Sequence, residues 1–410
     1  MQSLLEGIEQ ALTEQDAYTA ADFLNENYFY ETFYGDQATG KIPNINSIEK
    51  LVDSAISKVS YRPFLYDYFK SMIYLFEMED YKNAFEFMKK SVEKFINQVF
   101  DKENYWSVKL MKFLSSALYR AAVKAADAQE QEGETGDSED SHKLSPLAAA
   151  AMTLQTALAA SNRDRTNNIE ESKKWASLHI TNTLIRFYFK LNNLDWCSKY
   201  ISKAVLNDLN YPLSELVTFR FFAARVAILQ SKFVKAKEDL EYALTYCHED
   251  YTKNKKMIIR YLACVNLMLG KYPTQALCEK YDLMEFMELS KACRTGDLRT
   301  YKKCLAENMN FFIKDGTYLI LEKIKVVVYR NLLRRVYCYK EKSARIPIPT
   351  FLAALKFVED DPIDLDEAEC ILSNLIFSGF VRGYISHDKQ ILVVAKQNPF
   401  PSLSTLFAEE

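Results

Sequence analysis

The chain has 410 residues, 49% of them hydrophobic, and a formal net charge of −3. This length and apolar content allow a large core in two or three domains. The net charge argues against a generally basic nucleic-acid binder, so any basic surface must be local. Because glycine is scarce while Leu, Ala, Lys and Glu are common, the composition favours helices.

The cysteine pattern and the N-terminus predict a soluble nuclear or cytosolic protein. Eight cysteines are scattered without a CxxC pair, which suits buried free thiols in a reducing compartment. The first residues, MQSLLEGIEQALTEQ, are acidic and amphipathic and lack a signal-peptide pattern. No apolar run reaches the ~18 residues that a membrane span needs.

The first 125 residues read as N-terminal helical hairpins. Five apolar residues recur with helical spacing and predict the first amphipathic helix: Leu4, Leu5, Ile8, Ala11 and Leu12. A second helix is expected over 19–28, and glycine and proline over 34–46 indicate a loop. Further helices are expected over 61–78, 84–100 and 106–126.

Residues 126–146 differ from their surroundings in composition. The stretch AADAQEQEGETGDSEDSHK holds seven acidic residues and no large apolar one, and Ser145-Pro146 ends it. Such a segment cannot bury enough apolar surface to order itself, so we predict an acidic disordered insertion. A solvated loop between two helices and an acidic regulatory segment both fit this composition.

Residues 147–315 contain a repeated phrase typical of TPR-like helical repeats. LNNLDWCSKYI, QSKFVKAKEDL and LGKYPTQALCE each place a polar turn before an apolar anchor: Leu194, Phe233 and Tyr272, 39 residues apart. The theme recurs at Leu298 and appears earlier at Tyr81. Periods of ~34 to 47 residues with two helices each indicate an α-solenoid.

Residues 316–397 are predicted to form a winged-helix subdomain, followed by a tail over 398–410. Helices are expected over 316–337, 349–358 and 364–379, with an extended piece at 346–348. Asp364 and Glu367 have capping-box spacing, and Gly379 fits a left-handed C-terminal cap. Val, Ile and Tyr over 381–386 and 390–396, around the turn at 387–389, predict a β-hairpin. The expected fold is mostly α: a right-handed α-solenoid of TPR-like helical hairpins capped by a C-terminal winged helix.

Several phrases resemble PCI-domain proteins, the modules shared by the proteasome lid, the COP9 signalosome and a translation-initiation factor. They are IEESKKWASLHITNTLIRFYFKLN, YLILEKIKVVVYRNLLRRVY, FLAALKF, CILSNLIFSGFVRGYISH and VVAKQNPFPSLST. They span residues 169–405 in the order and spacing of the PCI subunit of the transcription-and-export complex 2. They are also similar to a signalosome-associated PCI protein of fungi.

The resemblance implies a non-catalytic scaffold subunit that carries mRNA from transcription to nuclear pores. Its implied partners are a GANP-type export scaffold, a small acidic disordered DSS-type protein, nuclear pore components and nonspecific RNA or DNA, with no membrane. The implied location is the nucleus at its pores, with the cytoplasm also open. The alternative is a PCI subunit of a signalosome-like or proteasome-lid-like assembly that acts through protein contacts alone.

The winged helix itself is ill suited to reading DNA through helix 364–379. That helix carries four acidic residues and no Lys or Arg, and phosphates repel an acidic face. Basic residues lie just before and after it, and we predict that they form a nonspecific RNA or DNA surface. These are Lys323, Lys325, Arg330, Arg334, Arg335, Lys340, Lys342 and Arg345, with Arg382, Lys389 and Lys396 of the hairpin. An ordinary solvated basic face or a dock for an acidic peptide remains an alternative.

Two further groups are expected to meet protein partners. A strand edge offers unpaired backbone groups, so we predict partner contacts at Val381, Tyr384, Ile391 and Val393. Ile385, Leu392 and Val394 are expected in the core. A second basic group, Lys253, Lys255 and Lys256, could bind an acidic disordered partner, although a solvated surface is the more common meaning of such clusters.

The sequence contains none of the motifs that would indicate catalysis or cofactor binding. There is no GxxxxGK[ST] phosphate loop and no GxGxxG after a strand. The four histidines, His142, His179, His248 and His387, are dispersed and lack zinc spacing. We therefore expect no enzyme activity, no metal and no cofactor.

Overall fold

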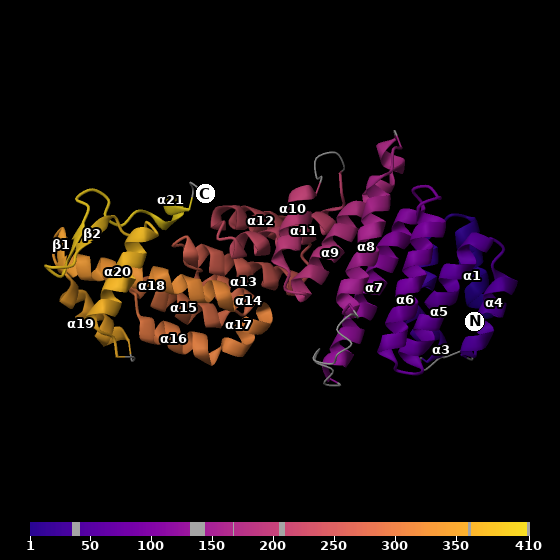
Figure 1. The fold of residues 1–410 in the computed structure, drawn as a ribbon, viewed down its shortest axis with the longest axis horizontal. Helices are drawn as coiled ribbons and strands as arrows, with labels where there is room; N and C mark the ends of the chain where they lie inside the picture. Colours follow the sequence, from indigo (N-terminus) through magenta and orange to yellow (C-terminus); the bar gives the residue numbers. More distant parts are fainter. Residues whose placement is uncertain (35–41, 132–143, 167, 205–209, 360–361, 408–410) are drawn as a thin grey trace. The chain divides into compact units, whose positions relative to one another are not determined.

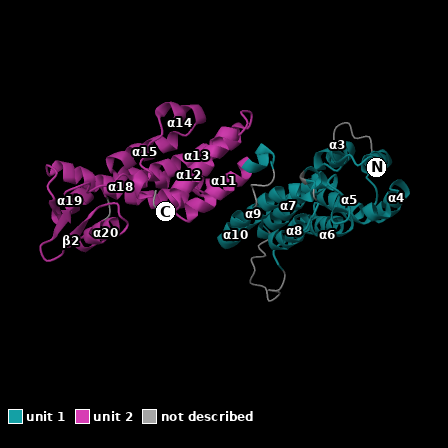
Figure 2. Cartoon of the chain, turned by 90° about the horizontal axis from the view of Figure 1, so that it is seen from above, with its two compact units in different colours: residues 1–216 teal, residues 217–410 magenta. Residues whose placement is uncertain are grey.

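The computed structural model describes residues 1–34, 42–131, 144–166, 168–204, 210–359 and 362–407 (Figure 1). The chain divides into two compact units, residues 1–216 and 217–410 (Figure 2). Most described residues are helical, and the strands form one small sheet near the C-terminus. None of the helices described is both long and apolar enough to span a membrane.

The N-terminal unit is a stack of helices in which α5, α6, α7 and α8 pack side by side (Figure 1). Its helices are α1 Gln2–Thr13, α2 Ala17–Phe23, α3 Glu26–Phe33, α4 Ile48–Ala55, α5 Arg62–Phe76, α6 Tyr81–Phe95, α7 Ser107–Gln131, α8 Pro146–Asn162, α9 Ser177–Lys190 and α10 Leu194–Lys203. Short 3-10 or π turns lie at 45–47, 59–61, 96–100, 169–171 and 173–176.

The predicted first helix is confirmed, and the second prediction is wrong. All five stripe residues of α1 are buried. The expected helix over 19–28 is instead two helices, α2 and α3. The break falls at Asn25, whose side chain accepts the backbone N–H of Asn27 at 3.0 Å and so caps α3.

The first residues of the predicted acidic insertion are helical. α7 continues to Gln131, so residues 126–131 are helical, because their Ala- and Gln-rich sequence keeps good helix propensity. The acidic stretch 132–143 lies outside the described residues. The chain is helical again from Pro146, where the Ser145 hydroxyl accepts the N–H of Ala148.

Four of the five repeat anchors begin helices. Tyr81 opens α6, Leu194 opens α10, Phe233 opens α12 and Leu298 opens α16. Tyr272 also packs against the core, but it begins no helix, since Pro273 follows it and the next helix starts at Gln275. The predicted stacking of helical hairpins is confirmed.

The C-terminal unit holds further helices and the sheet. Its elements are α11 Leu213–Leu229, through which the boundary between the units passes, α12 Phe233–Tyr246, α13 Thr252–Met268, α14 Gln275–Tyr281, α15 Met284–Thr295, α16 Leu298–Glu307, α17 Met309–Asp315, α18 Tyr318–Tyr339, β1 Arg345–Pro347, α19 Ile348–Val358, α20 Leu365–Phe377, β2 Gly383–Ser386, β3 Ile391–Val394 and α21 Leu403–Leu406.

The last elements form a winged helix. The three strands are antiparallel in the order β1-β3-β2, and the register places Ile346 and Ile385 on either side of Leu392. Leu392 and Ile346 are buried against the helices. The order helix, strand, helix, helix, hairpin from α18 to β3 is that of a winged helix, as predicted.

The start of α20 follows the predicted capping box. The Asp364 carboxylate accepts the N–H of Glu367 at 2.8 Å, and the Glu367 carboxylate accepts the N–H of Asp364 at 3.2 Å. The backbone of Gly379 is left-handed, with φ +74°. Both ends of α20 are therefore specified by local sequence.

The N-terminal unit contains a histidine that burial keeps neutral. The ring Nε2 of His179 in α9 lies 3.1 Å from the Ser116 hydroxyl, and its Nδ1 lies 3.7 Å from the Glu215 carboxylate. Burial, followed by the charges of Lys112 and Arg186, lowers the pKa of His179 to about 4. Glu215 pairs with Lys112 at 2.8 Å, while burial raises the pKa of Glu215.

We expect acid to destabilise this unit through His179. Between pH 6.5 and about 4 the unfolded chain binds a proton that the folded chain refuses, so stability falls as the pH falls through this window. The free energy of unfolding can fall by at most about 1.4 kcal/mol per pH unit. We expect a smaller loss here, because 26% of the His179 side chain is exposed to solvent. Urea unfolding at pH 7 and pH 5 measures the effect.

The matched variant for this experiment is His179→Gln, which keeps a polar group and does not titrate. Glu215 acts in the opposite direction, because its raised pKa favours the folded state in acid. The difference between the wild type and the variant isolates the histidine. An equal loss of stability in both chains would show that His179 does not carry the effect.

Candidate nucleic-acid and partner interface

The outward face of the sheet carries a cation and an aromatic ring on either side of its central strand. The strand register sets Arg345 of β1 and Tyr384 of β2 abreast of Val393 in the central strand. Residues abreast in an antiparallel sheet project from the same face. Arg345 is exposed and Tyr384 is 62% exposed, so this face offers both a positive charge and an exposed ring.

The end of α18 continues the basic character. Arg334 and Arg335 are exposed on its last turns, and Arg335 donates from Nη1 to the Thr295 carbonyl at 2.7 Å. This bond holds the side chain in place without neutralising its charge. Lys340 and the exposed Lys342 follow the helix end, in the short connection to β1.

The wing adds exposed Arg382, Lys389 and Lys396. In contrast, α20 presents acidic side chains. Glu369 lies 2.7 Å from Nδ1 of His387 in the hairpin turn, and this hydrogen bond raises the pKa of His387. The positive residues thus lie on α18, β1 and the wing, and α20 contributes none.

One predicted member of this surface is not at the surface. Arg330 is 4% exposed, and its guanidinium donates to the Pro401 carbonyl at 2.7 Å and to the Asn331 side chain at 3.0 Å. Burial, with the nearby charge of Arg334, lowers the pKa of Arg330 to about 10. The prediction of Arg330 as a nucleic-acid contact is therefore wrong.

Two other predicted contacts have partners within the chain. Lys325 pairs with Glu322 at 2.6 Å, one turn away on α18, and is half-buried. The ammonium of Lys323 lies 3.3 Å from the Ser231 hydroxyl but the residue is exposed. Charge therefore concentrates toward the C-terminal end of α18 rather than along its whole length.

The tail predicted after the wing packs against the rest of the C-terminal unit. The Phe400 ring is tilted against the Tyr337 ring, with centroids 5.3 Å apart, and the Arg330 guanidinium lies over Phe400. Leu403 in α21 is buried. Phe407 packs edge-on against Phe233 of α12 and Phe380, with centroids 5.1 Å and 6.0 Å away. We call residues 398–407 the C-terminal strap. The apolar spacing of its Phe and Leu residues was the available signal.

The partner prediction for the hairpin needs two corrections. Val381 is 1% exposed and its N–H bonds to the Leu375 carbonyl, so it belongs to the core. β3 is the central strand, so Ile391 and Val393 offer only half-buried side chains and no free backbone edge. The edge strands are β1 and β2, and Tyr384 lies on β2. The core predictions for Ile385, Leu392 and Val394 are confirmed.

The second basic group, Lys253, Lys255 and Lys256, lines a groove of about 520 Å³ between the start of α13 and the end of α14. Lys253 is exposed, and Lys255 and Lys256 are half-buried. Lys256 pairs with Asp282 at 2.7 Å. Lys280 and Tyr281 join the lining, so a net positive groove with an aromatic wall results.

Stacked helical hairpins that end in a winged helix define the class of this protein, and the PCI domain family matches residues 305–396. The PCI domain-containing protein 2 homolog of Dictyostelium discoideum is 39% identical over 79% of this chain and 75% of the relative. PCI domain-containing protein 2 of Xenopus laevis is 38% identical over 80% and 81%. The chain belongs to the PCI domain-containing protein 2 family. A Neurospora crassa protein described as a CSN12 homolog is 29% identical over 72% of each chain.

Proposed function

We propose that this chain is a non-catalytic scaffold subunit of a nuclear mRNA export complex of the transcription-and-export 2 type. Its winged helix pairs with a GANP-type scaffold, and the two together present a nonspecific RNA- or DNA-binding surface at nuclear pores. The observation that carries this proposal is the alignment of Arg345 and Tyr384 on one exposed sheet face, together with exposed Arg334 and Arg335 on the last turns of α18, the helix that precedes β1.

The chemistry of this face supports single-stranded nucleic acid as its ligand. Arginine and lysine neutralise phosphates regardless of sequence, and an exposed aromatic ring stacks on any base. The acidic α20 would keep duplex DNA out of the position that a reading helix usually takes. We assign the surface to Arg334, Arg335, Lys340, Lys342, Arg345, Arg382, Lys389 and Lys396.

The lysine groove supports a separate contact with the small acidic DSS-type protein. Four lysines, Lys253, Lys255, Lys256 and Lys280, face two acidic residues, Glu249 and Asp282, in its lining. An acidic segment would gain ion pairs there, and the Tyr281 ring would cover part of its apolar surface. The alternative is a subunit of a signalosome-like assembly, which the similarity to the Neurospora crassa CSN12 homolog favours.

Co-purification of the tagged full chain tests the proposal. We expect an export scaffold and nuclear pore components, whereas recovery of signalosome subunits would support the alternative. Tyr384→Asp should lose the scaffold by placing a charge in the strand interface, yet keep the acidic protein. Lys253→Glu with Lys255→Glu and Lys256→Glu should do the reverse. Retention of the scaffold by folded Tyr384→Asp would contradict pairing through β2.

A further inference from the structure

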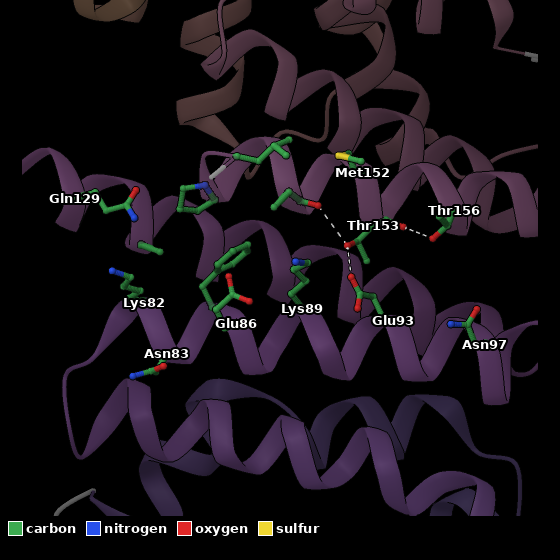
Figure 3. A pocket seen from close by; sticks show the side chains of 15 residues that line it. Lys82, Asn83, Glu86, Lys89, Glu93, Asn97, Gln129, Met152, Thr153 and Thr156 are labelled. Atoms are coloured by element: carbon green, nitrogen blue, oxygen red, sulfur yellow. Dashed lines mark hydrogen bonds between the residues drawn. The ribbon is translucent and has the colours of Figure 1, made fainter. Parts of the chain in front are cut away.

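The N-terminal unit contains a groove that the proposed function does not use. It has a volume of about 900 Å³ and runs between α6 and α8, and Ala125 and Gln129 of α7 also line it (Figure 3). Buried Phe85 and Ala125 form part of the floor. Ala149 and Thr153 of α8 form one wall, and their small side chains leave the groove wide.

One rim of the groove is apolar and exposed. Met152 on α8 is 55% exposed, and Leu144 just before α8 is 57% exposed. Both line the groove. An apolar side chain of a bound partner would bury these two residues together with Ala149, and this burial would drive binding.

The other rim is a row of side chains on α6 that alternate between positive and negative charge. Lys82, Glu86, Lys89 and Glu93 are four, three and four residues apart, so they share one helix face over about 16 Å. Lys82, Glu86 and Lys89 make no ion pair within the residues described. Glu93 accepts a hydrogen bond from the Thr153 hydroxyl at 3.1 Å across the groove (Figure 3).

We propose that this groove between α6 and α8 binds an amphipathic helix of a partner protein. The apolar stripe of that helix lies on Met152, Leu144 and Ala149, and its flank carries alternating acidic and basic residues opposite α6. Only a helix presents side chains at the same spacing as the rim. Because two positive and two negative charges cancel along the rim, it offers no net attraction to RNA or to a uniformly acidic peptide.

The test uses two synthetic helical peptides of about 18 residues, or five turns. Both carry the same leucine stripe, and their flanks read Glu-Lys-Glu-Lys or Lys-Glu-Lys-Glu. Binding to the full chain is measured by fluorescence anisotropy. We expect one peptide to bind about fivefold more tightly, since each surface ion pair contributes little. The variant E86K/K89E keeps the net charge and should abolish this preference, because each peptide then meets two attractive and two repulsive charges.

A second variant tests the apolar rim. Met152→Asp should weaken both peptides at least about tenfold, because it places a charge against the leucine stripe. Met284→Asp is the matched control, since Met284 is also half exposed but lies in the C-terminal unit. Circular dichroism checks that each variant is folded.

Three results would overturn the proposal. They are no binding of either peptide, equal binding that E86K/K89E leaves unchanged, and unchanged binding by folded Met152→Asp. Tighter binding of a uniformly acidic peptide or of single-stranded RNA, reduced by Met152→Asp, would assign the groove to that ligand instead. None of these results bears on the RNA surface of the C-terminal unit, so the two proposals can fail separately.

Discussion

Replacing Arg334, Arg335 and Arg345 together by glutamate should weaken single-stranded RNA binding at least about a hundredfold at low salt. Each lost phosphate contact removes a counterion-release contribution, and each new carboxylate repels the backbone. The slope of log affinity against log salt concentration should become shallower by about 2, at about 0.7 for each of three contacts. Fluorescence anisotropy over a salt series measures both quantities.

This experiment uses the full chain, alone and together with its co-purified partners. The matched control reverses three exposed lysines elsewhere in the C-terminal unit: Lys235 on α12, Lys303 on α16 and Lys314 on α17. The change in net charge is identical, so a difference between the two variants reports position rather than total charge. Equal slopes for the wild type and the arginine variant would remove these residues from the RNA surface.

Replacing Leu403 and Phe407 of the C-terminal strap by alanine should lower the free energy of unfolding of the C-terminal unit by about 4 kcal/mol. Both side chains are buried, and Phe407 packs against aromatic rings of α12 and of the winged helix. Domains are usually stable by only about 5–15 kcal/mol, so this loss is large. Urea unfolding of the full chain measures it.

Ser404→Ala is the control for the strap, since Ser404 is exposed on the same short helix and should cost at most about 0.5 kcal/mol. If the double variant does not fold, Phe407→Leu gives a milder test. It keeps an apolar side chain and should cost about 1 kcal/mol. A double variant as stable as the wild type would show that the strap does not fasten α12 to the winged helix.

The strap also explains why a positively charged residue is tolerated inside the unit. Within the described residues the Arg330 guanidinium hydrogen-bonds to no carboxylate; it donates to the Pro401 carbonyl and to the Asn331 side chain, and it lies over the Phe400 ring. Carbonyl and amide acceptors offset part of the cost of burying the charge. The strap therefore supplies an acceptor that the buried Arg330 needs, and Arg330 in turn helps to hold the strap in place.

Local patterns in the sequence were enough to predict most of the helices and most of the winged helix. The apolar stripe of α1, the capping box at Asp364 and the helix starts at Leu194 and Phe233 all depend on residues within a few positions of one another. Such signals arise from helical periodicity and from hydrogen bonds between neighbours, so they survive without knowledge of the rest of the fold.

The sequence by itself determined that this chain is a stack of helical hairpins with a winged helix and a cluster of basic residues near it. Only the tertiary structure decided which basic residues face solvent and which parts of the hairpin are free to bind a partner. Arg330 is buried and donates to a carbonyl 71 positions later in the chain. Val381 lies in the core, and β1 pairs with one edge of β3. Burial and strand order depend on contacts between distant segments, and neither charge nor local spacing encodes those contacts.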